Sequence, residues 1–191
     1  MDLIGAIKSA PIVDLAILFG LALFVIVGVV QGPIRRVLDI AAILVAFLFA
    51  ANLKDTLGDF FNANWRQFDL GYNRTLAFAI VFVVLTVILT GAIQTFYHRV
   101  DLNPAHPIVD DILGAIVALV EGVLVLLIVV VILGAYRLHD ARPGDLAQFR
   151  QAQDLIINQS HIAHWLREMV VPVFVHVLAP LLPADLVAVY P

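Results

Sequence analysis

Three apolar stretches of this chain carry a Gly or an Ala at every fourth position. These residues are Gly28 and Gly32, then Ala42, Ala46 and Ala50, and finally Gly114, Ala118 and Gly122. Residues four positions apart lie on one face of a helix. Because no hydrophobic force draws one helix to another in lipid, small residues on one face are what allow two backbones to pack closely. The pattern predicts several membrane helices packed into a bundle.

The composition supports this prediction and excludes several classes of function. Hydrophobic residues make up 62% of the 191 residues and charged residues 14%, which is outside the range of soluble domains. The net charge is -4 and the basic residues are scattered, so we expect the lipid bilayer, and no nucleic acid, as a partner. The absence of cysteine excludes disulfides, thiolate chemistry and Cys-ligated metals.

The apolar runs predict an all-α membrane protein, a four-transmembrane-helix bundle with amphipathic interfacial helices. We expect spans at about 12–30, 37–53, 75–97 and 110–135, each long enough to cross the hydrocarbon core. They make residues 1–136 a four-span membrane domain. The break at Gln31, Gly32 and Pro33, followed by Arg35 and Arg36, predicts a helical hairpin of the first two spans.

The remaining segments are amphipathic. Five large apolar residues recur at helical spacing between Lys54 and Arg74, which fits a helix at the headgroup boundary or, equally, a helix packed on the bundle. We expect 137–191 to be an amphipathic, membrane-associated tail, with helices near 145–157 and 160–171. Pro172, Pro180 and Pro183 interrupt its apolar end, so we expect no regular fifth span there.

Glu121 is the main candidate for a functional polar residue. It lies in the fourth span, near the expected bilayer centre, where an ionised side chain costs about 2.5–3.5 kcal/mol. Thr86, Thr90 and Gln94 form a polar stripe on the third span, at the same depth if these two helices are antiparallel neighbours. We expect Glu121 to bond to this stripe, either as a structural clamp, which we favour, or as part of a proton or ion path.

Other polar residues stand near helix ends. Asp14, Arg35 and Asp110 are further candidates, and Asp39 is expected to pair with the nearby arginines. His161, His164 and Glu168 share a helical face, for which an interfacial polar surface is a better interpretation than a metal site. No nucleophile, metalloprotease or phosphate-binding motif occurs, so we expect no enzyme activity, cofactor or metal.

The fourth span also resembles a known pattern. Asp110, Leu113, Gly114, Ala118 and Gly122 resemble the D-x-x-L-G-x-x-x-G-x-x-x-G motif of the CvpA family, the colicin V production proteins. Asp14, Gly32 and Arg35 match the family's first hairpin, and Ser160 resembles a recurrent serine ahead of its C-terminal helix. The resemblance covers about residues 12–171. Four residues depart from it. Gln31, Asp111 and Glu121 stand where the family commonly has Arg, and Ala118 stands where it has Gly.

The resemblance implies a non-enzymatic protein of the bacterial inner membrane that supports peptide-toxin production or export, or envelope homeostasis. It would act through membrane-protein partners or self-association. The alternative is a small channel or transporter component that uses Glu121 and the Thr86, Thr90 and Gln94 stripe.

Four spans place both termini on one side of the membrane. The count of Lys and Arg favours cytoplasmic termini. Relatives that carry a periplasmic protease after the fourth span imply periplasmic termini, and we follow the relatives.

Overall fold

The chain is built from helices in a computed structural model, which describes residues 11–65, 68, 70–96, 107–135 and 159–190. Four long helices come first: α2 (Ile12–Gln31), α3 (Pro33–Asn64), α4 (Leu70–Phe96) and α5 (Pro107–Ala135). A C-terminal group follows: α7 (His161–Trp165), a π-helical turn (Leu166–Val170), α8 (Val171–Leu178), a short 3-10 turn (Ala179–Leu181) and α9 (Ala184–Val189). No strand occurs in the described part of the chain.

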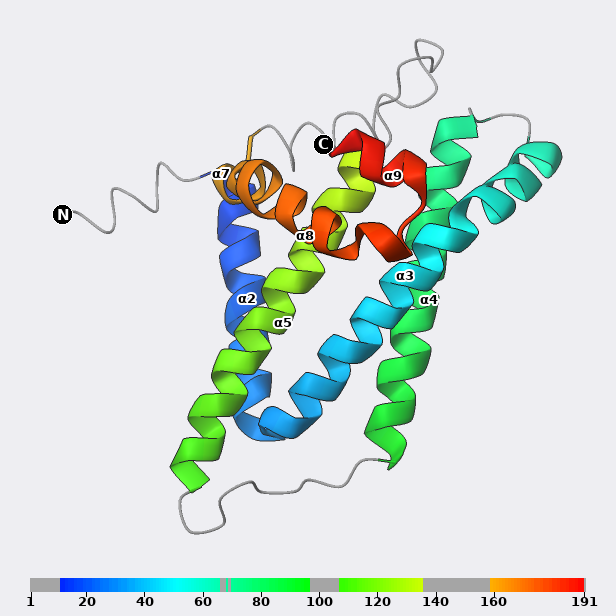
Figure 1. Cartoon of the computed structure of the whole chain (residues 1–191). Helices are drawn as coiled ribbons and strands as arrows, with labels where there is room; N and C mark the ends of the chain where they lie inside the picture. The colour runs from blue at the N-terminus through cyan, green and yellow to red at the C-terminus, as the bar shows by residue number, and fades with distance from the viewer. Residues whose placement is uncertain (1–10, 66–67, 69, 97–106, 136–158, 191) are drawn as a thin grey trace.

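The break between α2 and α3 lies where the sequence predicts it. Gly32 has a φ of 78°, a left-handed conformation that favours glycine over residues with a side chain. Pro33 then opens α3, where its missing N–H costs nothing because the first N–H groups of a helix have no partner in that helix. The two helices diverge from this turn (Figure 1).

Helix α3 is longer than predicted. It has 32 residues, or about 48 Å, whereas the hydrocarbon core is about 30 Å thick. The prediction of a separate helix over 54–74 is therefore wrong, because residues up to Asn64 continue α3 and Leu70 begins α4. Gly58 allows α3 and α4 to pack closely, because a Cβ atom at this position would lie only 2.7 Å from Cα of Arg74 on α4.

The four long helices pack as two pairs. Helix α2 packs against α5, and α3 packs against α4 (Figure 1). Helix α3 also contacts α5, whereas α4 and α5 make little contact with each other. The third and fourth spans are therefore not close neighbours, and close packing of these two spans is the condition on which the predicted contact of Glu121 depends. The glycines of α2 and α5, described below, explain why α5 prefers α2.

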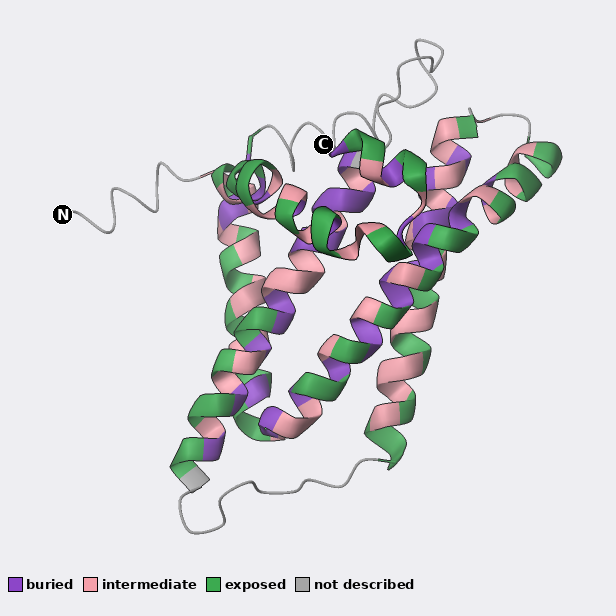
Figure 2. Ribbon diagram, in the orientation of Figure 1, coloured by how far each residue is buried: buried purple, intermediate pink, exposed green. Residues whose placement is uncertain are grey.

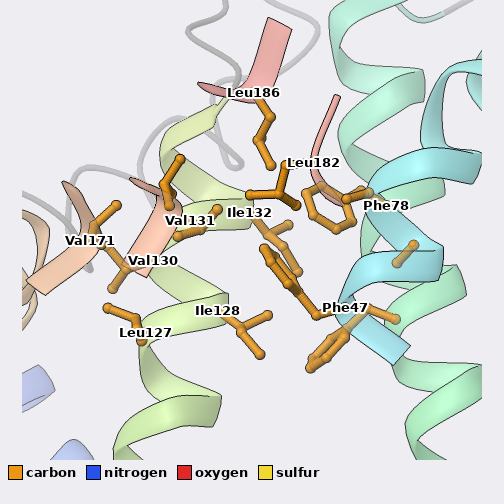
Figure 3. Close-up of a cluster of buried hydrophobic side chains, with 14 of the residues drawn as sticks. Phe47, Phe78, Leu127, Ile128, Val130, Val131, Ile132, Val171, Leu182 and Leu186 are labelled. Carbon is orange, nitrogen blue, oxygen red and sulfur yellow. The ribbon is translucent and has the colours of Figure 1, made fainter. Parts of the chain in front are cut away.

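The apolar core lies where the C-terminal helices meet α3, α4 and α5. Phe47 of α3 packs against Phe78 of α4 and Phe174 of α8, with ring centroids 5.8 and 5.4 Å apart. Ile128 and Val131 of α5 and Leu186 of α9 complete the same cluster (Figure 3). The long helices bury the faces they turn to one another and expose the others (Figure 2), which in a bilayer are the faces that meet lipid.

Five helices of the described chain are long and apolar enough to cross a membrane. The fifth, His161–Leu181, has a mean hydropathy of 1.4, against 2.0–3.3 for the others, and runs across the bundle instead of alongside it (Figure 1). The prolines do not shorten this helix as the sequence predicts, because it reaches 21 residues; whether it crosses the membrane is a separate question. A π-helical turn precedes Pro172, and the helix continues through that residue. The helix predicted at 145–157 lies outside the described residues.

Candidate functional site

Two glycines bring α2 and α5 into backbone contact. A Cβ atom on Gly28 would lie 2.5 Å from the carbonyl oxygen of Gly114 and closer still to Cβ of Ala118. A Cβ atom on Gly114 would contact the carbonyl oxygen of Gly28 and lie 3.2 Å from Cα of Gly32. Only glycine allows this approach. Gly32, the glycine of the hairpin turn, therefore lies beside Gly114 of α5.

The other small residues of the repeating pattern also lie inside the protein. Ala42 and Ala46 are buried along α3, and Ala118 is buried on α5. A Cβ atom on Gly122 would lie 2.9 Å from Leu21 of α2.

A buried ion pair joins the start of α3 to the middle of α5. Arg36 donates from Nη1 to Oε2 of Glu121 at 2.7 Å, and both side chains are only 6% exposed. Nη2 of the same guanidinium donates to Oε1 of Gln31 at 2.6 Å. One arginine therefore binds the last residue of α2 and the acid of α5 at once.

A second acid lies beside this pair. Oδ2 of Asp39 is 3.9 Å from Nη1 of Arg36 and 3.9 Å from Nε of Arg35. The cluster thus contains two cations and two anions, and its formal charge is zero. Neutrality lowers the cost of burying Arg36, Asp39 and Glu121, and of partly burying Arg35, in an apolar bundle.

The predicted contact between Glu121 and the threonine stripe does not form. Glu121 bonds to Arg36, while the Thr90 hydroxyl donates to the carbonyl oxygen of Thr86 on its own helix at 2.7 Å. The Thr86 hydroxyl has no hydrogen-bond partner among the described residues, and Gln94 is exposed. The physical reason is that α5 packs on α2 and α3, away from this face of α4.

The position of Glu121 along α5 follows from the contact between the two glycines. Gly114 is level with Gly32, and Glu121 is seven residues further along α5, which corresponds to about 10 Å.

A second polar contact joins the start of α2 to the start of the His161–Leu181 helix, which is called the C-terminal helix below. The Ser160 hydroxyl donates to Oδ1 of Asp14 at 2.5 Å and accepts the N–H of Ala163 at 3.0 Å. The backbone N–H groups of His161 and Ile162 donate to Asp14 at 3.2 and 3.4 Å. Asp14 and Ser160 therefore cap α7 together, satisfying N–H groups that a helix start leaves open.

Asp110, His164 and Glu168 lie outside these two polar contacts. Asp110 is buried in the first turn of α5, where a negative charge interacts favourably with the helix dipole. His164 lies 3.1 Å from Glu168, one turn along the C-terminal helix. Within the described residues, no three acidic or histidine side chains gather as metal ligands would.

Sequence reasoning missed the partners in both contacts. Arg36 binds both Gln31 and Glu121, yet of these three residues only Glu121 is predicted as a functional residue. Ser160 is a family landmark in the sequence, but its pairing with Asp14 spans 146 positions and leaves no local signal. Each contact forms only because helices distant in sequence become neighbours.

These features define a polytopic α-helical membrane protein whose buried polar groups connect its helices. The chain belongs to the colicin V production protein family, whose sequence model matches residues 13–171. No curated protein and no solved structure matches it.

Proposed function

We propose that this protein is a non-enzymatic component of the bacterial inner membrane that supports production or export of a peptide toxin, or integrity of the envelope. It would act through membrane-protein partners or self-association. The family match suggests the process, and the pairing of the buried charges favours a scaffold over a catalyst or channel.

The observation that carries this proposal is the Arg36–Glu121 pair. An acid used for transport has to meet water or a passing ion, whereas Glu121 is 4% exposed and bound to a cation. The channel alternative relied on contact between Glu121 and the Thr86, Thr90 and Gln94 stripe. That contact is not made, so no specific observation favours this alternative.

We propose further that α2, α3, α4 and α5 are the spans and that the His161–Leu181 helix lies at the membrane surface. The start of α2 and the end of α5 lie at the same end of the bundle (Figure 1), as an even number of crossings requires. Following the relatives, we place both termini in the periplasm. A C-terminal alkaline phosphatase fusion should then be active, and a fluorescent fusion there dark; the opposite pair of results would reverse this orientation.

The function is tested by deleting the gene in its bacterium and measuring peptide-toxin export and survival under envelope stress. We expect at least one to fall, and the wild-type gene to restore it. If the deletion strain matches its parent in both, the proposal is wrong.

A further inference from the structure

A pocket of about 330 Å³ opens beside the end of α5. The C-terminal helix supplies its charged wall through His164, Arg167 and Glu168, and Tyr190 closes another side. Pro172 and Val189 supply apolar surface. The pocket thus offers a cation, an anion and apolar contacts within one small volume.

Arg167 is the unusual member of this set. It is partly buried, yet it has no hydrogen bond or ion pair within the described part of the chain. Glu168, by contrast, is held by His164. Both Arg167 and Glu168 lie in the π-helical turn, a distortion that recurs at functional sites. A guanidinium that lines a pocket and has no partner among the described residues is suited to bind an anion, and its planar donors match phosphate in particular.

The position of the pocket indicates where the anion comes from. Gly134 lines it and is the last residue of the apolar stretch Ile108–Gly134, so the pocket lies where α5 leaves the hydrocarbon core. The C-terminal helix that forms its wall also exposes large apolar side chains at every fourth position. These are Trp165, Met169, Val173, Val177 and Leu181. Such a stripe, with Trp among its members, fits the boundary between headgroups and acyl chains.

We propose that this pocket binds the zwitterionic headgroup of phosphatidylethanolamine. Arg167 would hold the phosphate with two parallel N–H donors, and the Glu168 carboxylate beside it would accept the ammonium group. Pro172 and Val189 would contact the glycerol and the first methylenes. An acid next to the cation disfavours a purely anionic headgroup, so Glu168 makes the pocket selective for a headgroup with an amine. This inference stands independently of any role in toxin export.

The test is native mass spectrometry of the full-length protein in detergent, titrated with phosphatidylethanolamine or phosphatidylglycerol. The wild type should bind phosphatidylethanolamine more tightly. Arg167→Gln should weaken that binding about tenfold, as expected for loss of a charged hydrogen bond, while Arg167→Lys should keep part of it. Glu168→Gln should remove the preference for the amine. His161→Gln, an exposed change on the same helix outside the pocket, is the matched control and should bind as the wild type does.

Three results would overturn the proposal. One is equal binding of both lipids by the wild type, and another is equal binding of phosphatidylethanolamine by wild type and Arg167→Gln. The third is displacement of the lipid by inorganic phosphate at matched concentration, which would make the pocket a site for free anions. Melting curves of each variant distinguish lost binding from lost folding.

Discussion

Glycine at position 28 matters because of what it touches, not because of where it lies in α2. At Gly20, two turns earlier in α2, an added Cβ atom would have nothing within 4 Å. At Gly28 the same atom would meet the backbone of Gly114. The two positions therefore form a matched pair in which the same substitution has different surroundings.

We predict that Gly28→Ala separates α2 from α5 and lowers the melting temperature in detergent. Overpacking of this kind typically costs about 1–3 kcal/mol. Gly20→Ala should leave the melting temperature unchanged or raise it slightly, because alanine favours helix over glycine. Equal melting temperatures for the two variants would contradict the close approach of the helices.

Ser160 offers a second prediction for a single residue. Ser160→Ala removes a cap from α7 and one donor from Asp14, which should cost about 1–2 kcal/mol. Faster hydrogen exchange at Ile162 and Ala163 would report the loss. Thr90→Ala is the control, because that hydroxyl only bonds back to its own helix and should contribute little. Unchanged exchange in Ser160→Ala would show that Asp14 alone supplies the cap.

Individual residues were predictable from the sequence only in part. The four-residue spacing of Gly28 and Gly32, and of Gly114 and Ala118, identifies positions that come to lie at a helix contact. The partner of Glu121 was not predictable in this way. Depth along a helix can be counted, but the side of the bundle on which a neighbour stands depends on packing between distant segments.

Among the elements, α9 shows most clearly how the C-terminal group is attached. Lys54 of α3 is fully buried and donates to Oδ2 of Asp185 at 2.6 Å and to Asp55 at 2.8 Å. Burial alone would raise the pKa of Asp185, but the hydrogen bond and charge of Lys54 outweigh it, so this pKa lies below its ordinary value of 3.8. The carboxylate is thereby kept charged.

This lowered pKa predicts how the attachment depends on pH. The pair contributes its full stability above the ordinary pKa of Asp185 and loses it as pH falls through the lowered one. The wild type should therefore melt above Asp185→Asn at neutral pH, and the difference should vanish in acid. Melting curves between about pH 2 and pH 7 test this. A difference that grows in acid would contradict the assigned direction.

Asp59→Asn is the control for this experiment. Asp59 pairs with Arg74 at an exposed position, where such a pair contributes at most about 1 kcal/mol. Its effect on melting should be small across the same range.

The long elements were predictable because lipid demands uninterrupted apolar runs, and Gly32 with Pro33 gives a clear stop. The extension of α3 was not predictable from the polar residues after Leu53. These residues continue the helix because Lys54 and Asp55 find partners on α9 and α4, contacts that no local pattern reveals.

For the whole molecule, the arrangement in two pairs changes what the buried charges can do. Small residues bring α2 to α5, and this places α5 beside the start of α3, where Arg36 meets Glu121. The ion pair is then a connection between the two pairs of helices. If it serves only as a connection, the protein should need the pairing and not the charges themselves.

The measurement that tests this most directly compares Arg36→Met, Glu121→Leu and the double variant, by melting in detergent and by complementation of the deletion strain. Each single change leaves a buried charge without its partner and should cost about 3 kcal/mol and reduce toxin export or envelope tolerance. The double variant leaves Arg35 and Asp39 in charge balance and should recover most of both losses. If the double variant, inserted at wild-type level, is as defective in complementation as Glu121→Leu, the acid itself is required and the account of a structural clamp is wrong.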